Sequence, residues 1–245
     1  MIFKSNLYNF LSAIYFAITS PGMVLKIFKI KKLQLTYLNF SKLINLSRCV
    51  KSIDRYQIPG VIVEAGCALG GSAILIALSK SKYRELNIYD TFEQIPPPSV
   101  MDEADAFERY QTIKDGKAKG IRNGQYYGYE ENLLTKVINN FTNFNLSPEE
   151  HKIFLHQGLF EDTLKITEPV AMAHIDSDWY DSIITSLERI VPKLSYNGII
   201  LIDDYYDWKG AKKAVNDFFS DKRDHFQFLY GPQLVIRKTS RILTD

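Results

Sequence analysis

Residues 61–74 decide the fold, and their sequence is VIVEAGCALGGSAI. A short apolar run at 61–64 is followed by a turn that contains Gly66, Gly70 and Gly71, and then by a second apolar run at 72–80. This order predicts a buried strand, a glycine-bearing turn and a helix. A ligand lying against such a turn would meet the free backbone amides of the first helical residues.

The same alternation continues along the chain and predicts an α/β fold. Short, almost entirely apolar strands between helices are typical of a Rossmann-like, doubly wound, mostly parallel sheet with helices on both faces. Two last strands, joined by Gly231-Pro232, predict a C-terminal antiparallel pair. The expected strands are 61–64, 86–89, 153–156, 171–175, 199–202, 226–230 and 233–237, with helices at 36–57, 72–80, 182–191 and 208–219 and a turn at 195–198.

Charge divides the chain into two parts. The first 60 residues carry nine Lys/Arg against one acid, a balance of +8, whereas the net charge of all 245 residues is +2. We expect residues 1–35 to form a basic, apolar and helical N-terminal extension and residues 36–245 to form one domain. Two cysteines and the lack of a clear secretory signal indicate a reducing compartment, so we expect a cytoplasmic protein.

The N-terminal extension leaves two alternatives open. Its apolar run at 7–18 is short for a membrane span. The first alternative is a helix packed on the domain or on another subunit. The second is a peripheral anchor at the inner face of the membrane, in which residues 1–32 place apolar side chains in lipid and lysines on anionic headgroups.

Residues 93–131 interrupt the alternation. They contain Pro96-Pro97-Pro98 and, near their end, Tyr126, Tyr127 and Tyr129. A connection of this length is usually functional, and this one directly follows a predicted strand. We predict a lid with aromatic side chains that covers the carboxyl ends of the strands, with a surface insertion of no role as the alternative.

Acids follow two of the later strands. Asp176 and Asp178 follow the strand at 171–175, and Asp203 and Asp204 follow the strand at 199–202. Because parallel strands end at one edge of a sheet, three carboxylates (Asp176, Asp203 and Asp204) are expected to meet and to bind Mg²⁺. Asp178 is the candidate base for a substrate hydroxyl; the alternatives are a helix N-cap for Asp178 and a simple turn at Asp203-Asp204.

Other polar residues at this edge suit a different ligand. Glu64 precedes the glycine turn, where it would repel a pyrophosphate but would suit an ammonium or sulfonium group. Asp90 can accept hydrogen bonds from both hydroxyls of a ribose, and Gln157 can reach an adenine edge. An amino acid joined to a ribose describes S-adenosylmethionine, although a glycine turn needed only for packing stays an alternative. His174, inside an apolar strand, is expected in the core.

Five blocks of the sequence together resemble the macrocin O-methyltransferase (TylF/MycF/NovP-type) family. The resemblance spans about residues 36–220 and keeps the blocks in the same order. The blocks are Glu64-Ala65-Gly66 with Gly70-Gly71-Ser72-Ala73, Asp90-Thr91-Phe92-Glu93, GLFEDTL at 158–164, IDSDWYDS at 175–182, and PKL at 192–194 with Gly198 and IDDY at 202–205.

The resemblance implies a class I methyltransferase fold, S-adenosylmethionine as methyl donor and Mg²⁺-dependent methylation of a sugar hydroxyl. The acceptor would be a glycosylated metabolite or a surface polysaccharide, and a homo-oligomer is expected. Ala68-Leu69 replaces an aromatic-basic pair usual in the antibiotic-tailoring members, which leaves the acceptor open. Asp176, Asp203 and Asp204 would hold the metal, and Asp178 would be the general base. The expected cofactor-binding residues are Glu64, Gly66, Gly70, Ser72, Asp90, Thr91, Gln157 and Asp176.

Two other functions compete with this one. Asp176-Ser177-Asp178 also matches the D-x-D motif of a metal-dependent nucleotide-sugar glycosyltransferase, but that function leaves the turn at 64–71 unexplained. A catalytically degenerate, membrane-associated scaffold is opposed by the intact acids. Nucleic acid is not an expected partner, because the basic residues lie in an apolar segment and the predicted site is acidic.

Overall fold

A seven-stranded sheet forms the centre of the protein in the computed structural model, which describes residues 14–241. The strand order is β3-β2-β1-β4-β5-β7-β6; β1 to β5 are parallel, and β7 is antiparallel to both of its neighbours. The predicted α/β fold with an antiparallel C-terminal pair is therefore confirmed. The strands are β1 Val61–Ala65, β2 Leu86–Asp90, β3 Ile153–Gln157, β4 Val170–Ile175, β5 Leu194–Ile202, β6 Phe226–Tyr230 and β7 Leu234–Lys238.

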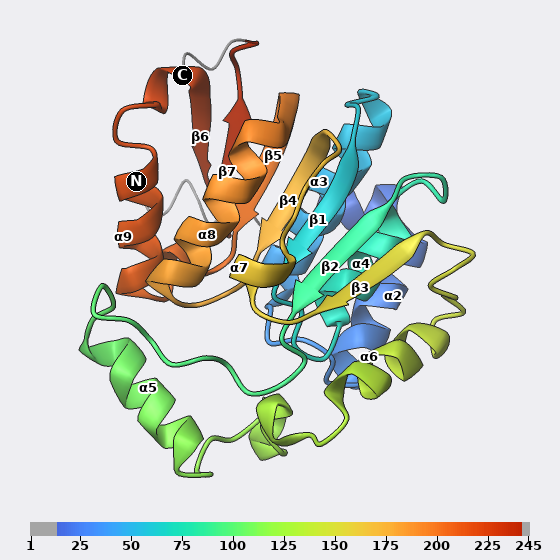
Figure 1. The fold of residues 1–245 in the computed structure, drawn as a ribbon. Coiled ribbons are helices and arrows are strands. Elements are labelled where there is room, and N and C mark those ends of the chain that lie inside the picture. Colours follow the sequence, from blue (N-terminus) through green and yellow to red (C-terminus); the bar gives the residue numbers. More distant parts are fainter. Residues whose placement is uncertain (1–13, 242–245) are drawn as a thin grey trace.

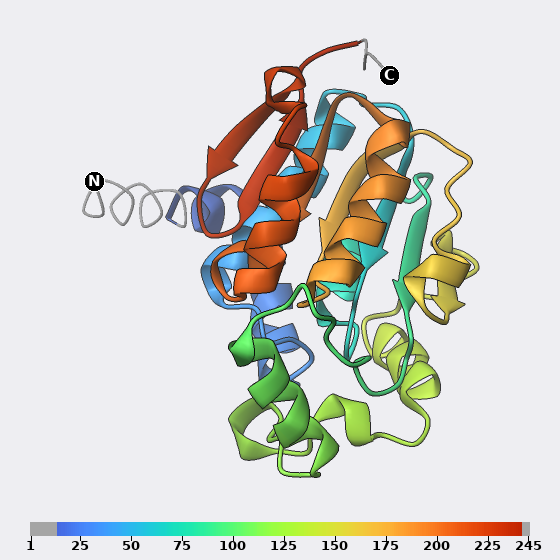
Figure 2. The same ribbon diagram turned by 60° about the vertical axis from the view of Figure 1, so that its left-hand side comes forward.

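Helices cover both faces of this sheet (Figure 1). Buried side chains of α2, α3, α4 and α6 form one apolar cluster with one face, and those of α8 and α9 form a second cluster with the other face. Figure 2 shows α8 and α9 side by side on that second face. The bounds are α2 Pro21–Lys32, α3 Phe40–Arg55, α4 Gly71–Ser79, α5 Ala104–Lys114, α6 Leu133–Thr142, α7 Phe160–Thr163, α8 Tyr180–Ile190 and α9 Lys209–Phe218.

The carboxyl ends of the central strands are level with one another. Ala65 pairs with Tyr89 on one side and with Ile175 on the other, and Ile175 pairs with Ile202. Backbone bonds extend this alignment, since the Asp176 N–H donates to the Ala65 carbonyl at 2.9 Å. The chain also reverses its direction of travel across the sheet at β1, which lies between β2 and β4. Such a switch point is where open α/β sheets bind ligands.

One predicted turn is wrong. Residues 195–198 lie inside β5, which begins at Leu194. The pairing with β4 runs from Val170↔Leu194 directly to Met172↔Ile199, so the additional residues of β5 bulge out of the ladder. Asn197 takes a left-handed conformation there, with φ of 61°. Turn-forming residues can thus be accommodated within a strand when the hydrogen bonds on both sides of them are kept.

Residues 93–131 form a folded unit beyond the carboxyl ends of the strands (Figure 1, green). Besides α5 they contain two 3-10 turns, Ile121–Asn123 and Tyr127–Tyr129, which the sequence did not predict. Ile113, Ala118 and Tyr126 form a small buried cluster, and the Tyr129 hydroxyl donates to the Ile113 carbonyl at 2.6 Å. This segment is therefore held by a core of its own.

The described part of the N-terminal segment packs on the domain. Met23, Ile27 and Ile30 on α2 are buried in the same cluster as α3 and α4. The opposite face of α2 leaves Leu25 and Phe28 exposed, at 71% and 55%. Residues 1–13, with much of the apolar run at 7–18, lie outside the described residues. Within 14–241, no helix has the length and apolar character needed to cross a membrane.

Candidate active site

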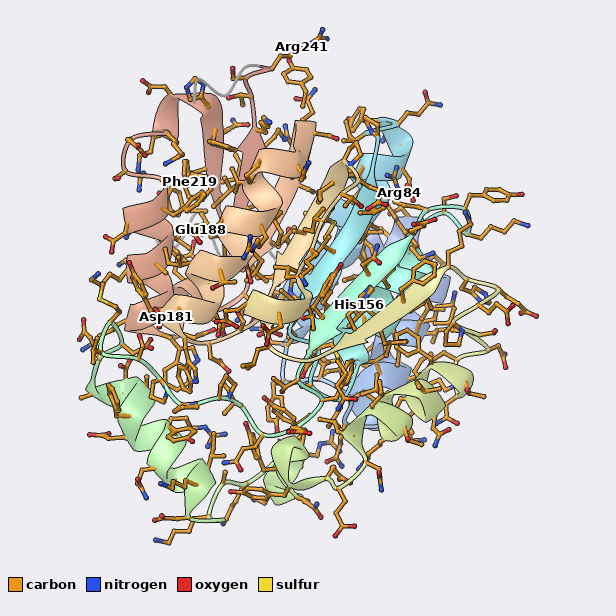
Figure 3. All side chains as sticks on the ribbon, viewed as in Figure 1. Arg84, His156, Asp181, Glu188, Phe219 and Arg241 are labelled. Atoms are coloured by element: carbon orange, nitrogen blue, oxygen red, sulfur yellow. The ribbon has the colours of Figure 1, made fainter. Side chains whose placement is uncertain are left out.

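A cavity of about 760 Å³ lies at the carboxyl ends of β1, β2, β4 and β5. Its wall is formed by the glycine turn after β1, by the residues that follow the other three strands, and by parts of the segments 36–42, 93–127 and 159–161. Asp181, in the first turn of α8, also lines it, and Figure 3 shows this residue at the end of α8 that faces residues 93–131. The volume is within the range of small-molecule and cofactor sites.

The glycine turn is shaped by contact with the neighbouring strand. Gly66 has φ of 86°, and a Cβ atom there would lie 1.9 Å from the Asp176 carbonyl oxygen. Only glycine fits this position without displacing the backbone. The Gly66 N–H donates to the Tyr89 carbonyl at 2.8 Å, so the turn begins as an extension of the sheet. The close approach places the turn directly beside the acids that follow β4.

Asp90 holds the same turn from the side of β2. Its Oδ2 accepts the Cys67 N–H at 2.7 Å and the Ala68 N–H at 3.1 Å, and its Oδ1 accepts the Phe92 N–H at 2.8 Å. Ala68 and Phe92 both have positive φ, of 47° and 52°. The carboxylate thus compensates for two strained residues, and it also lines the cavity. The proposed ribose contact would be made by a carboxylate that already accepts three backbone bonds.

The predicted cofactor-binding residues divide into two groups. Gly66, Ser72, Asp90, Thr91 and Asp176 line the cavity. The other three predicted residues, Glu64, Gly70 and Gln157, are not among the described residues that line the cavity.

The structure explains why each of these three residues lies outside the cavity lining. Glu64 is fully buried and lies on the α3–α4 face of the sheet with Ile62, because side chains alternate along a strand. Its Oε1 is 3.0 Å from His174 Nδ1, which places His174 in the core as predicted. Gly70 starts α4 against Val137. Gln157, on the outer part of the sheet, is exposed and donates to the Thr91 carbonyl at 3.3 Å.

Three carboxylates meet beside the glycine turn. Asp176, Asp203 and Asp204 offer oxygen atoms that all lie within 4.8 Å of one another. Burial, followed by repulsion from the neighbouring carboxylates, raises the pKa values of Asp176 and Asp204 well above their ordinary value. A hard divalent cation such as Mg²⁺ stabilises a set of close oxygen donors like this one, of which two are buried and one is partly buried. The donor set of this chain therefore fits that ion.

Asp178 is held at both its backbone and its side chain. It has φ of 59°, its N–H donates to Asp204 Oδ2 at 3.0 Å, and its Oδ1 accepts the indole N–H of Trp208 at 2.7 Å. Burial raises the pKa of Asp178 to about 6, although the bond from Trp208 lowers it in part. The N-cap alternative is wrong, because Asp102 Oδ1 instead accepts the N–H of Tyr180 at the start of α8.

Several residues of the site were missed by the sequence analysis. Trp208 lies only four positions after Asp204, so its short distance along the sequence could have predicted that it lies near the acids. Lys42 Nζ lies 2.9 Å from Asp203 Oδ2 and 2.7 Å from Asp207 Oδ2, and no sequence pattern links it to acids 161 or more positions away. The Trp179 indole N–H donates to the Pro96 carbonyl at 2.9 Å, which attaches the start of segment 93–131 to the loop that carries Asp178.

The segment 93–131 contributes aromatic and cationic side chains. Tyr126, Tyr127 and Arg109 line the cavity, and the Arg109 guanidinium lies 5.3 Å from the centre of the Tyr126 ring. Burial raises the pKa values of both tyrosines, so their phenols are neutral at physiological pH. These residues therefore add neutral aromatic rings and one positive charge to a cavity whose other side carries the acids.

The chain is similar in sequence to known O-methyltransferases. The family model described as Macrocin-O-methyltransferase (TylF) matches residues 31–225. The demethyldecarbamoylnovobiocin O-methyltransferase of Streptomyces niveus is 30% identical over 190 residues, which are 75% of this chain and 67% of that protein. A Streptomyces olivaceus enzyme named for 4'-O-methylation of a dimethoxy-rhamnosyl tetracenomycin is 29% identical over 189 residues, 75% of this chain and 67% of that enzyme.

A solved structure shares the fold of this chain. The O-methyltransferase NovP has a TM-score of 0.68 with 24% identity, covering 84% of this chain and 83% of that chain. The resemblance carried by the five sequence blocks is thereby confirmed, and it favours methyl transfer over the glycosyltransferase interpretation of Asp176-Ser177-Asp178. The chain belongs to the macrocin O-methyltransferase family and is an S-adenosylmethionine-dependent O-methyltransferase.

Proposed function

We propose that this protein methylates a sugar hydroxyl of a glycosylated metabolite or a surface polysaccharide, in a reaction that depends on Mg²⁺. The observation that carries the proposal is the meeting of three acids (Asp176, Asp203 and Asp204) with Asp178 in the cavity that also holds the glycine turn. The rhamnosyl substrate in the name of the Streptomyces olivaceus relative supports a sugar acceptor.

The methyl donor and the metal ion would occupy distinct parts of the cavity. Gly66, Ser72, Asp90 and Thr91 would contact S-adenosylmethionine, and the three acids would hold Mg²⁺. When bound, the first supplies an electrophilic methyl group and the second a positive charge that makes a nearby hydroxyl more acidic. Asp176 lies next to both parts, since its carbonyl oxygen touches Gly66 and its carboxylate belongs to the acid cluster.

Asp178 is the proposed general base. Its Oδ1 is engaged by Trp208, which leaves Oδ2 to take the proton of the acceptor hydroxyl. A pKa raised to about 6 by burial makes this carboxylate a stronger base than an exposed aspartate while it is still ionised at neutral pH. The left-handed backbone at Asp178, held by Asp204, fixes the direction from which the proton is taken.

Residues 93–131 are proposed to orient the acceptor and to exclude water. Tyr126 and Tyr127 present neutral rings to the cavity, as sugar-binding walls do, and Arg109 packs over the first of them. Two bonds, from Trp179 to the Pro96 carbonyl and from the Tyr180 N–H to Asp102, tie the start of this segment to the residues beside Asp178. Closure of the acceptor under this wall would align its hydroxyl with the donor.

The test is calorimetry and turnover with the full chain. S-adenosylhomocysteine and Mg²⁺ should both bind, methylation of a sugar acceptor should stop in EDTA and return with Mg²⁺, and Asp204→Ala should abolish the magnesium stimulation while S-adenosylhomocysteine still binds. Undiminished turnover in EDTA would remove the metal role. Stabilisation by a UDP-sugar with Mn²⁺, but not by S-adenosylhomocysteine, would favour the rival glycosyltransferase.

A peripheral membrane contact through residues 1–32 is a second proposal. It is supported by the exposed Leu25 and Phe28 on α2 and by exposed lysines on the same helix, Lys26 and Lys32. Because α2 also contributes to the core, the test is Leu25→Ser with Phe28→Ser rather than a deletion, with Tyr83→Ser as an exposed control. Sedimentation with phosphatidylglycerol vesicles should fall in the double variant alone; equal sedimentation would remove this role. Self-association of the chain stays a prediction, which light scattering in solution would test.

A further inference from the structure

Asp203 differs from the other two acids of its cluster in the donors that reach it. Its Oδ2 accepts from Lys42 Nζ at 2.9 Å, and its Oδ1 accepts from Gln233 Nε2 at 2.8 Å. Lys42 belongs to α3, and Gln233 precedes β7, so two elements remote in sequence converge on one carboxylate. Both oxygens of Asp203 are therefore oriented by the protein before any ligand arrives.

Gln233 is the more informative of the two donors. Its side chain is fully buried, and its Oε1 accepts from Asn45 Nδ2 at 3.2 Å. A carboxylate can only accept, so the amide NH₂ of Gln233 must face Asp203 and its oxygen must face Asn45. Rotating the amide would place its oxygen against the Asp203 carboxylate and leave buried polar groups without partners, which is costly. The bonds from Asn45 through Gln233 to Asp203 therefore have a single direction.

The two donors would act differently on a bound cation. Lys42 orients Asp203, but its positive charge would also repel a bound metal ion. Asp207 Oδ2 lies 2.7 Å from Lys42 Nζ and offsets part of that repulsion. Gln233 orients the same carboxylate without adding charge. Hydrogen bonds of this kind to a metal-binding carboxylate are typically worth about 10–100-fold in metal affinity.

We propose that Gln233, held by Asn45, is a positioning residue of the divalent-cation site: it fixes the orientation of the Asp203 carboxylate beside Asp176 and Asp204. The proposal rests on the magnesium role proposed above and adds to it a contribution from the connection between β6 and β7, which lies outside the acid cluster.

The test is titration of Mg²⁺ into the full chain by calorimetry. Gln233→Met keeps the volume of the side chain and removes its hydrogen bonds, so Mg²⁺ binding should weaken about 10–100-fold. The affinity for S-adenosylhomocysteine should stay the same, and a high concentration of Mg²⁺ should restore turnover. Gln227→Met is the matched control, since Gln227 is an exposed glutamine on β6.

The outcomes separate this proposal from the one on which it rests. Mg²⁺ binding of unchanged strength in Gln233→Met would overturn the positioning role alone, whereas an unmodified chain that takes up no Mg²⁺ would overturn the metal role and this proposal with it. If Gln233→Met does not fold, Asn45→Leu removes only the donor behind Gln233. It should weaken Mg²⁺ binding by a smaller factor, and unchanged binding in that variant would also overturn the proposal.

Discussion

The two sides of the cavity handle negative charge in opposite ways. On the β2 side, Asp90 accepts three backbone N–H groups and is satisfied by the protein itself. On the β4–β5 side, Asp204 is buried and Asp176 and Asp178 are partly buried beside it, and desolvation and mutual repulsion raise their pKa values. A carboxylate with enough donors stabilises a turn, whereas a cluster with too few donors stores repulsion that a cation or a proton relieves.

The largest effect of breaking this contrast should come from Asp178. Asp178→Asn removes the proposed proton acceptor but keeps the shape of the side chain, so turnover should fall by about 10²–10⁴-fold. The affinity for S-adenosylhomocysteine, measured by calorimetry, should change little. The exposed Asp162 on α7 provides the control variant Asp162→Asn. Turnover that is equal in both variants would remove Asp178 as the base.

Asp90→Ala should affect stability rather than chemistry. It removes three hydrogen bonds to a charged group and leaves two residues of positive φ without support. We expect a loss of roughly 2–4 kcal/mol in the free energy of unfolding, measured in urea, with weaker S-adenosylhomocysteine binding. A variant that is as stable as the natural chain would show that the turn does not depend on this carboxylate.

Trp208→Phe tests the hydrogen bond that the Trp208 indole donates to Asp178. The ring packing against Trp179, at 5.2 Å between centroids, is largely kept, while the indole N–H is lost. We expect kcat to fall about tenfold, equivalent to about 1.4 kcal/mol, with KM for S-adenosylmethionine unchanged. A change in KM alone, measured by steady-state kinetics, would assign Trp208 to binding instead.

The smallest effect concerns pH and metal together. The pKa values of Asp176, Asp178 and Asp204 are raised in the folded state. Without metal, these groups therefore stabilise the fold most when they are protonated. This contribution to the free energy of unfolding is lost as the pH rises through the folded-state pKa, which is about 6 for Asp178. Magnesium should therefore raise the melting temperature more at about pH 7.5 than at about pH 5.5. An equal gain at both values, or a larger one at the lower pH, would contradict the idea of stored repulsion.

Some parts of the site followed from local sequence. An apolar run followed by acid predicts a buried strand with a carboxylate at its end, and parallel pairing brings such ends together whatever the helices do. That reasoning placed Asp176, Asp203 and Asp204 in one cluster and Asp178 beside them, and it also predicted the α/β sheet. It failed where a local pattern has two solutions, as at residues 195–198, which the structure keeps inside β5.

By itself, the sequence determined the approximate positions of the strands, the mostly parallel character of the sheet and the edge at which the acids collect, because hydrophobic periodicity and strand ends are local properties. Only the tertiary structure decided which side chains reach those acids. Lys42 and Gln233 arrive from α3 and from the β6–β7 connection, and Glu64 lies away from the cavity, next to His174. The physical reason is that a side-chain hydrogen bond depends on the relative placement of whole elements, which no short stretch of sequence specifies.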